Sequence, residues 1–283
     1  MTALPAKSAF TDVDVTEGAF KTSLDNLRDY LAESIGETGG SIRASVVRSA
    51  LSATLGPLTG RNLLIGNFFV NQRAVSGSVV LSAGVYGHDR FKAGTGGCSY
   101  TFATSNGVPT VTISAGTLVQ VVEATNIVAG DYILSHAGTA QVQIDGGGYG
   151  DSGAVTATLN GSANATVEYG TGTLSLPQME LGTIVTAYDR RKVSEELTMC
   201  QFYYEECAAF GVSYGSSGSS IQRFSASYTV NKRVTPTVAV TKTSGSASGG
   251  AAITISKNAC FIGFSSSGQG QDWIGAIKVS AEI

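Results

Sequence analysis

Charge is scarce in this sequence. Only 14 % of its 283 residues are Asp, Glu, Lys or Arg, and the formal net charge at neutral pH is −3. Nucleic-acid surfaces need clustered Lys and Arg, so no nucleic acid is expected as a partner. The longest apolar runs, such as residues 62–70, are too short and too polar to span a bilayer. The first residues lack a basic patch followed by an apolar core, so neither a signal peptide nor membrane insertion is predicted.

Cysteine and histidine are also few. The four cysteines stand at Cys98, Cys200, Cys207 and Cys260 and include no C-x-x-C pair. Cys200 and Cys207 fall two turns apart on a predicted helix, about 10 Å, which is too far for a disulfide within it. Buried thiols and cross-chain disulfides in an oligomer both remain open. The two histidines, His88 and His136, have no metal-ligand spacing, so neither a metal nor a cofactor is expected.

Glycine, by contrast, is abundant, with 36 residues against 5 prolines. Together with Ser, Thr and Val in alternating patterns, this composition is typical of short strands and tight turns. From residue 61 onward about eight such strands are separated by turn clusters, among them 110–122, 132–134, 140–144, 154–159, 166–169 and 173–176. Residues 61–192 are therefore predicted to form a two-sheet β-sandwich.

The pattern changes period once in the middle of the chain, within residues 177–207. A strand is predicted at 178–187 and a charged turn follows it. Side chains then recur at helical spacing at Val193, Leu197, Cys200 and Tyr204. This spacing predicts a helix at 193–207 that links the sandwich to a smaller β module at 208–283.

The N-terminal 60 residues follow a third pattern. A helix is predicted at about 16–35, and its apolar residues have coiled-coil spacing: Phe20, Leu24, Leu27 and Leu31. About two heptads cannot hold a coiled coil in water by themselves. The seam is therefore expected to pack within the chain or to assemble because other parts hold a trimer together. A second short helix is predicted at about 41–55.

Several motifs occur in order along the chain. The first is carried by Leu4, Pro5, Phe10 and residues 15–21 and 27–31 (L-P, F, V-T-E-G-x-F-K, L-R-D-Y-L). The next are N-L-L-I-G-N-F-F-V-N-Q-R at 62–73 and Y-G-H-D-R-F at 86–91. Then come Q-x-E-x-G at 178–182, E-E-L-x-x-C-Q-x-Y-Y at 195–204 and R-V-T-P-T-V at 233–238. Together they resemble tail fibres and receptor-binding proteins of tailed bacteriophages, although Phe91 stands where that family has Trp.

The resemblance implies a mainly-β protein with four parts. These are a virion-attachment segment (1–60), a carbohydrate-binding-like jelly roll (61–192), a linking helix (193–207) and a C-terminal β tip (208–283). It implies a homotrimer in the virion that docks on tail, baseplate or collar proteins through residues 1–60 and binds a host cell-surface glycan. The alternatives are a purely structural collar or neck fibre and a glycan-degrading tailspike.

The receptor contact is expected in the C-terminal module. If the linking helix leads away from the sandwich, this module lies farthest from the anchor, and its Gly/Ser loops suit a binding role. The candidate contacts are polar and aromatic residues near those loops: Tyr214, Gln222, Arg223, Gln269, Gln271, Asp272 and Trp273. Trp273 has a second interpretation, as the residue that fills the core of the module.

No motif predicts catalysis. Gly148-x-Gly150-x-x-Gly153 matches a dinucleotide fingerprint, but a strand-like sequence follows it instead of a helix. Residues 211–215 match a nucleophile elbow, but they lie between a predicted helix and a loop. Glycoside hydrolysis would need a pair of carboxylates, and nothing in the sequence pairs Glu123, Asp145, Asp151, Glu168 or Glu180. The chain is therefore not expected to be an enzyme.

Asp89 and Arg90 carry opposite charges beside an aromatic residue in a strand-like motif. Such an arrangement is typical of a buried ion pair, so these two residues are predicted to be a structural pair.

Overall fold

The computed structural model describes residues 20–22, 24–27, 61–212, 220–266 and 270–283. The chain divides into two compact units, Met1–Leu58 and Thr59–Ile283. The described residues of the first unit are helical, and Phe20 and Leu24 are 42 % and 45 % exposed. Leu27 is half-buried, whereas Leu31 and the predicted helix 41–55 lie outside the described residues. The trimer seam therefore stays a prediction.

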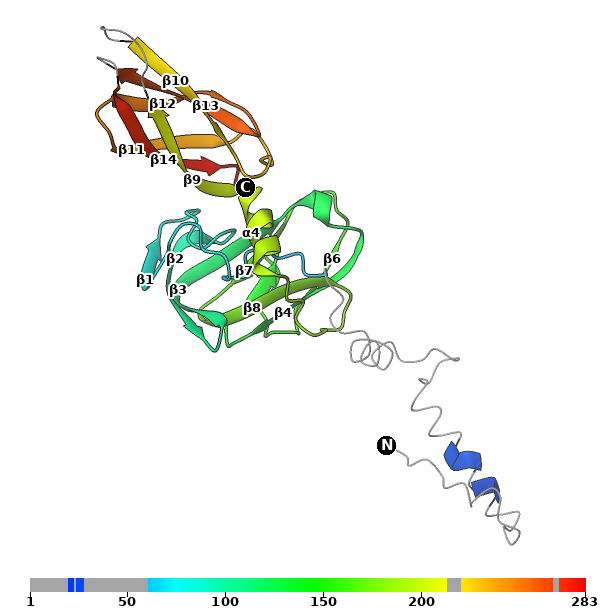
Figure 1. Ribbon diagram of the computed structural model, residues 1–283. Helices are drawn as coiled ribbons and strands as arrows, with labels where there is room; N and C mark the ends of the chain where they lie inside the picture. Colours follow the sequence, from blue (N-terminus) through cyan, green and yellow to red (C-terminus); the bar gives the residue numbers. More distant parts are fainter. Residues whose placement is uncertain (1–19, 23, 28–60, 213–219, 267–269) are drawn as a thin grey trace. The chain divides into compact units, whose positions relative to one another are not determined.

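The mainly-β prediction is confirmed in the second unit. Between residues 61 and 192, all of them described, eight antiparallel strands form one hydrogen-bonded network (Figure 1). They are β1 (Ser78–Leu81), β2 (Lys92–Ser105), β3 (Val108–Val122), β4 (Gly130–Ala137), β5 (Val142–Ile144), β6 (Thr156–Leu159), β7 (Ala165–Tyr169) and β8 (Gly172–Leu181). A short 3₁₀ turn, η1 (Ala124–Asn126), follows β3. The predicted strand 178–187 is wrong at both ends, because β8 begins earlier and ends at Leu181.

Strand β3 is shared between two parts of the network. Its first half pairs with β8 at Val111–Ile113, and its second half pairs with β7 at Leu118–Val122. Between them, Gly116 has a φ of +68°, and an added Cβ would lie 2.1 Å from the carbonyl oxygen of Gly97. This close approach of β2 and β3 requires glycine. The sandwich then closes over one core that includes Tyr100, Ile113, Leu118, Leu134, Tyr169 and Leu174.

The resemblance implies an opening strand at 62–73, but this segment forms no strand. Gly66, Asn67 and Phe68 have positive φ angles of 86°, 41° and 62°, which turn the backbone away from an extended path. Leu64 and Phe68 are nevertheless buried in the sandwich core. Apolar residues of this segment are therefore buried although its backbone is not extended.

The linking helix is shorter than predicted. Helix α4 spans Val193–Gln201, and Tyr204–Val212 is already strand β9. Because β9 pairs with β14 (Asp272–Ser280) over all nine of its residues, tertiary pairing overrides the helical spacing that had extended to Tyr204. The C-terminal module therefore begins at β9, and Cys207 lies on this strand rather than on a helix with Cys200. All four cysteines are free thiols in the chain.

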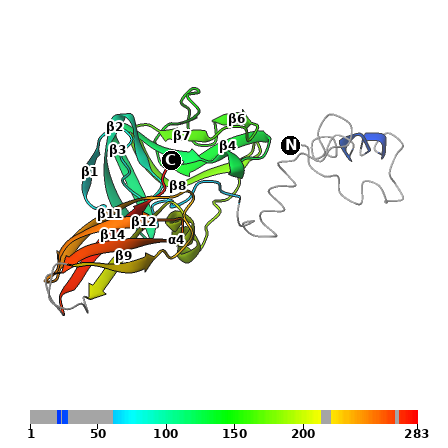
Figure 2. The ribbon, with the colours of Figure 1, turned by 90° about the horizontal axis from the view of Figure 1, so that it is seen from above.

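The C-terminal module contains two antiparallel sheets of three strands each in its described residues. One sheet has the order β10–β13–β12, from β10 (Ser220–Ser227), β13 (Ala259–Ser266) and β12 (Ser248–Ile255). The other has the order β11–β14–β9 and adds β11 (Thr237–Ser244); Figure 2 shows these three strands side by side.

Trp273 forms the centre of the core between these sheets. It is fully buried, and its ring nitrogen donates a 2.6 Å hydrogen bond to the carbonyl of Gly249. An added Cβ on Gly250 would lie 2.7 Å from the Trp273 ring, so glycine is required there. Phe224, Phe264 and Ile277 complete this core. The interpretation of Trp273 as a core residue is correct.

His88 gives the sandwich a predicted pH dependence. It is fully buried, and its Nδ1 lies 3.0 Å from the hydroxyl of Tyr100. Burial lowers the pKa of His88 from about 6.5 to about 4. Between these values the unfolded chain binds a proton that the folded chain does not, so stability is lost as the pH falls. The expected loss by pH 4 is on the order of 3 kcal/mol.

Denaturant unfolding at pH 7 and pH 4 measures this difference. His88→Gln should reduce this difference in the free energy of unfolding, whereas His136→Gln should leave the contribution of His88 unchanged. An unchanged difference in His88→Gln would show that the loss arises elsewhere.

Candidate functional site

Glu282 is the centre of a buried charged cluster that joins the C-terminal module to the sandwich. Its carboxylate accepts hydrogen bonds from Arg73, at 3.0 Å, and from Arg90. The Arg90 guanidinium also lies 3.6 Å from the centre of the Tyr203 ring, and that of Arg73 lies 3.7 Å from the centre of the Tyr204 ring. Two arginines of the sandwich thus hold one carboxylate and two aromatic rings from the linker and the module.

Asp89 and Arg90 are both buried and structural, but the predicted pair between them is wrong. Asp89 instead accepts hydrogen bonds from the backbone and the side-chain amide of Gln72, at 2.6 and 2.8 Å, and from Arg73, while Arg90 binds Glu282. Arg90 has a φ of +68°, so its backbone turns at this point and the two side chains take separate partners.

The candidate binding surface is the exposed face of the β10–β13–β12 sheet, which we call the outer face. Along β13, Cys260, Ile262 and Phe264 point into the core. Phe261 therefore points outward, because side chains alternate along a strand, and it is 47 % exposed. Ile253 on β12 is exposed to the same extent.

A hollow of about 340 Å³ opens on this outer face. Its lining residues are Arg223, Gly250, Ala251, Ile253, Gly263, Phe264 and Ser265. Gly263 stands between Arg223 and Ala251 in the strand ladder. Because Gly263 has no side chain, the outer face has a depression between the side chains of Arg223 and Ala251. Arg223 is exposed and has no hydrogen-bond or ion-pair partner among the described residues, so its guanidinium is available to a ligand.

The other predicted contact residues have different positions. Gln222 and Gln271 are half-buried, and Tyr214 and Gln269 lie outside the described residues. The carboxylate of Asp272 accepts two 3.0 Å hydrogen bonds from Ser246, which lower its pKa and fix a turn. Trp273 is removed from the contact set because it is buried. Phe261 and Ile253 were not predicted, although the alternation along residues 259–265 places Phe261 on the outer face.

Within the described ranges there is no group of three or more His, Cys, Asp or Glu side chains arranged to hold a metal ion. In the same ranges, no helix is both long and apolar enough to cross a membrane. Comparison of the chain with protein-family models, curated proteins and solved structures found no match. The interpretation of the site therefore depends on its geometry and on the sequence motifs.

The cluster around Glu282 gives a prediction about stability. Glu282→Ala leaves the buried guanidinium of Arg90 without its carboxylate, whereas Arg73 keeps Asp89 at 3.4 Å, so the free energy of unfolding should fall by about 3–5 kcal/mol. Urea denaturation measures the change. The matched control is Lys278→Ala, which removes an exposed ion pair with Glu206 at 3.6 Å and should cost less than about 1 kcal/mol. Equal losses in the two variants would contradict a special role for Glu282.

Proposed function

We propose that this protein is a non-enzymatic structural protein of a tailed-phage virion, a homotrimeric tail fibre that binds a host cell-surface glycan. The sequence motifs support the class of protein, and residues 1–60 are proposed to attach it to tail, baseplate or collar proteins. Phe20, Leu24, Leu27 and Leu31 are proposed to form the trimer seam.

The observation that carries the glycan-binding role is the outer face of the C-terminal module. Exposed Phe261 and Ile253 offer apolar surface to the C–H groups of a sugar, and Arg223 offers hydrogen-bond donors to its hydroxyl or carboxylate groups beside a hollow. One such shallow contact is weak. In a trimer, the first bound copy would hold the other two at a high effective concentration near the surface. The overall avidity would then exceed the affinity of one site, which suits attachment to a repetitive surface.

Three of the five candidate carboxylates for glycan hydrolysis have structural partners. Glu180 accepts a 2.6 Å hydrogen bond from the hydroxyl of Thr186, and Glu168 accepts one of 2.7 Å from Gln143. Asp145 accepts a 2.6 Å hydrogen bond from the backbone of Thr166. These bonds favour a binding protein over a tailspike hydrolase, because the groups hold strands and turns together.

Binding of the labelled full chain to arrayed bacterial capsule, O-antigen and cell-wall glycans tests the proposal. We expect saturable binding to a subset of glycans and a loss of about tenfold or more in Arg223→Ala and Phe261→Ala. Phe210→Ala is the control, because Phe210 is an exposed phenylalanine of the other sheet, on β9.

Three results would contradict the proposal. Absence of binding to every glycan would favour the collar or neck fibre. Release of reducing sugar from a bound glycan would favour the tailspike. Binding that Arg223→Ala and Phe261→Ala leave intact would remove the outer face as the receptor contact.

A further inference from the structure

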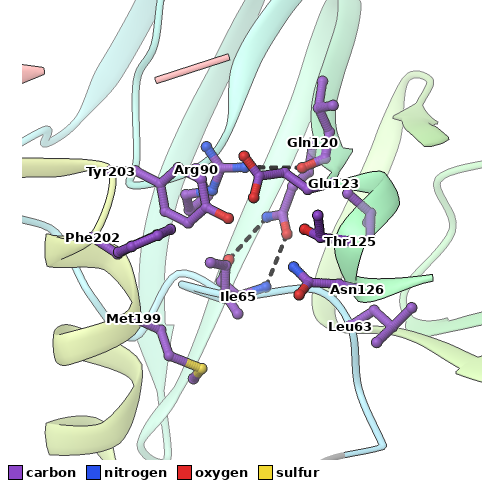
Figure 3. A pocket seen from close by; sticks show the side chains of 12 residues that line it. Leu63, Ile65, Arg90, Gln120, Glu123, Thr125, Asn126, Met199, Phe202 and Tyr203 are labelled. Carbon is purple, nitrogen blue, oxygen red and sulfur yellow. Dashed lines mark hydrogen bonds between the residues drawn. The ribbon is translucent and has the colours of Figure 1, made fainter. Parts of the chain in front are cut away.

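A second pocket, of about 310 Å³, lies between the sandwich and the end of helix α4 (Figure 3). Its volume is at the lower end of the range of about 300–1,000 Å³ typical of small-molecule sites. One wall comes from α4 and the residues after it, the opposite wall comes from η1, and the floor comes from the segment before β1. The side chains that line it include Leu63, Ile65, Gln120, Glu123, Thr125, Asn126, Met199, Phe202 and Tyr203.

The floor of this pocket is held in place by hydrogen bonds. The side-chain amide of Gln120 accepts a 2.8 Å hydrogen bond from the N–H of Ile65 and donates one of 2.9 Å to its carbonyl. Gln120 is only 1 % exposed, so both bonds are shielded from water. The floor therefore needs no rearrangement to receive a ligand, and the Leu63 and Ile65 side chains give it an apolar surface.

The upper part of the pocket is also preorganised. Arg90 stacks on the Tyr203 ring and donates a 2.9 Å hydrogen bond to the carbonyl of Val121. Burial raises the pKa of Tyr203 to about 12, so its hydroxyl stays protonated beside Glu123. Arg90 is 2 % exposed, and its Nε has no hydrogen-bond partner among the described residues.

The two walls have different chemistry, as Figure 3 shows. Phe202, 38 % exposed, and Met199 form the apolar wall. Glu123, Thr125 and Asn126 form the polar wall. The side chains of Thr125 and Asn126 are exposed and bond to no other described residue, so they are available to a ligand. Glu123 pairs with Arg233 at 3.2 Å, which offsets its charge but leaves acceptor capacity.

We propose that this pocket binds one ring of a neutral polyhydroxylated ligand, a pyranose. Such a ring has apolar C–H groups for Phe202 and hydroxyl groups for Glu123 and Asn126 on the opposite wall. Neither an anion nor a cation is favoured by charge, because Arg233 pairs with the Glu123 carboxylate at 3.2 Å. The inference adds a second sugar site to the proposed glycan-binding function, but it rests on this pocket and not on the virion assignment.

Saturation-transfer NMR on the full chain tests the proposal with four probes. They are the methyl α-glycosides of glucose, galactose and mannose, together with cyclohexanol, which has a ring but one hydroxyl. At least one glycoside should bind saturably, and cyclohexanol should bind at least about tenfold more weakly because it lacks most of the hydrogen bonds.

Variants then locate the binding. Phe202→Ala and Asn126→Ala should each weaken it about tenfold, whereas Phe202→Tyr, which keeps the ring, should retain it. The matched controls, Phe210→Ala and Asn231→Ala, change exposed residues elsewhere and should have no effect. Three results would overturn the proposal: no saturable glycoside, cyclohexanol binding as tightly as the glycosides, or glycoside affinity that both pocket variants leave unchanged.

The two sugar sites can fail separately. Arg223→Ala and Phe261→Ala should leave glycoside binding to this pocket intact. If they also leave binding to the glycan array intact while Phe202→Ala abolishes glycoside binding, the proposed role of the outer face fails and this inference stands.

Discussion

The carboxylate of Glu282 is the group on which the arrangement of the second unit depends. It lies two residues beyond β14, yet it binds Arg73 and Arg90, which precede β2 in the sequence. A buried carboxylate of this kind is stable only when it is paired and hydrogen-bonded, so the segment after β14 has a strong preference for this one position. Because Glu282 and the arginines belong to opposite ends of the unit, this contact closes a loop of about 200 residues.

Neighbouring contacts extend the same constraint to the linker. Tyr203, between α4 and β9, and Tyr204, the first residue of β9, stack on the two arginines that hold Glu282. Inside α4, Glu196 accepts hydrogen bonds from the backbone of Gly66, at 2.7 Å, and from Arg191, at 2.8 Å. On the other side of the linker, the fully buried Lys232 binds Glu205 at 2.6 Å. The short helix is therefore a fixed connection between the sandwich and the module, and in the proposed function it would hold the outer face in a constant orientation.

Local patterns in the sequence predicted the fold correctly where the alternation of apolar side chains matched an extended backbone conformation. The strands that end in Val122 and Tyr169 are examples, because their inward residues pack in one core. The patterns failed where distant partners decide the conformation. Tyr204 continues a helical spacing, but the nine-residue pairing with β14 makes it the first residue of a strand. Residues 62–73 match a strand motif, but the left-handed turn at Gly66–Phe68 is fixed by close packing on Asp89.

In the candidate sites, too, local features could be predicted from the sequence and features that depend on distant residues could not. Arg223 was predicted from its residue type and its place near a loop, whereas the hollow beside it depends on Gly263, which the β10–β13 register brings opposite Arg223. The partner of Arg90 is 192 residues away, so no local motif could indicate it. The pocket beside Phe202 combines residues from four separate segments, and only the folded chain brings them together.

The contacts around Glu282 require that the sandwich and the C-terminal module fold as one cooperative unit. Trp273 is the only tryptophan, and it lies in the core of the module, so its fluorescence in guanidinium chloride reports on the module alone. Hydrogen exchange of residues 111–122, read by mass spectrometry at the same denaturant concentrations, reports on the sandwich. Cooperative unfolding gives a single midpoint for both signals. Loss of the Trp273 signal at a denaturant concentration that leaves residues 111–122 protected would contradict it.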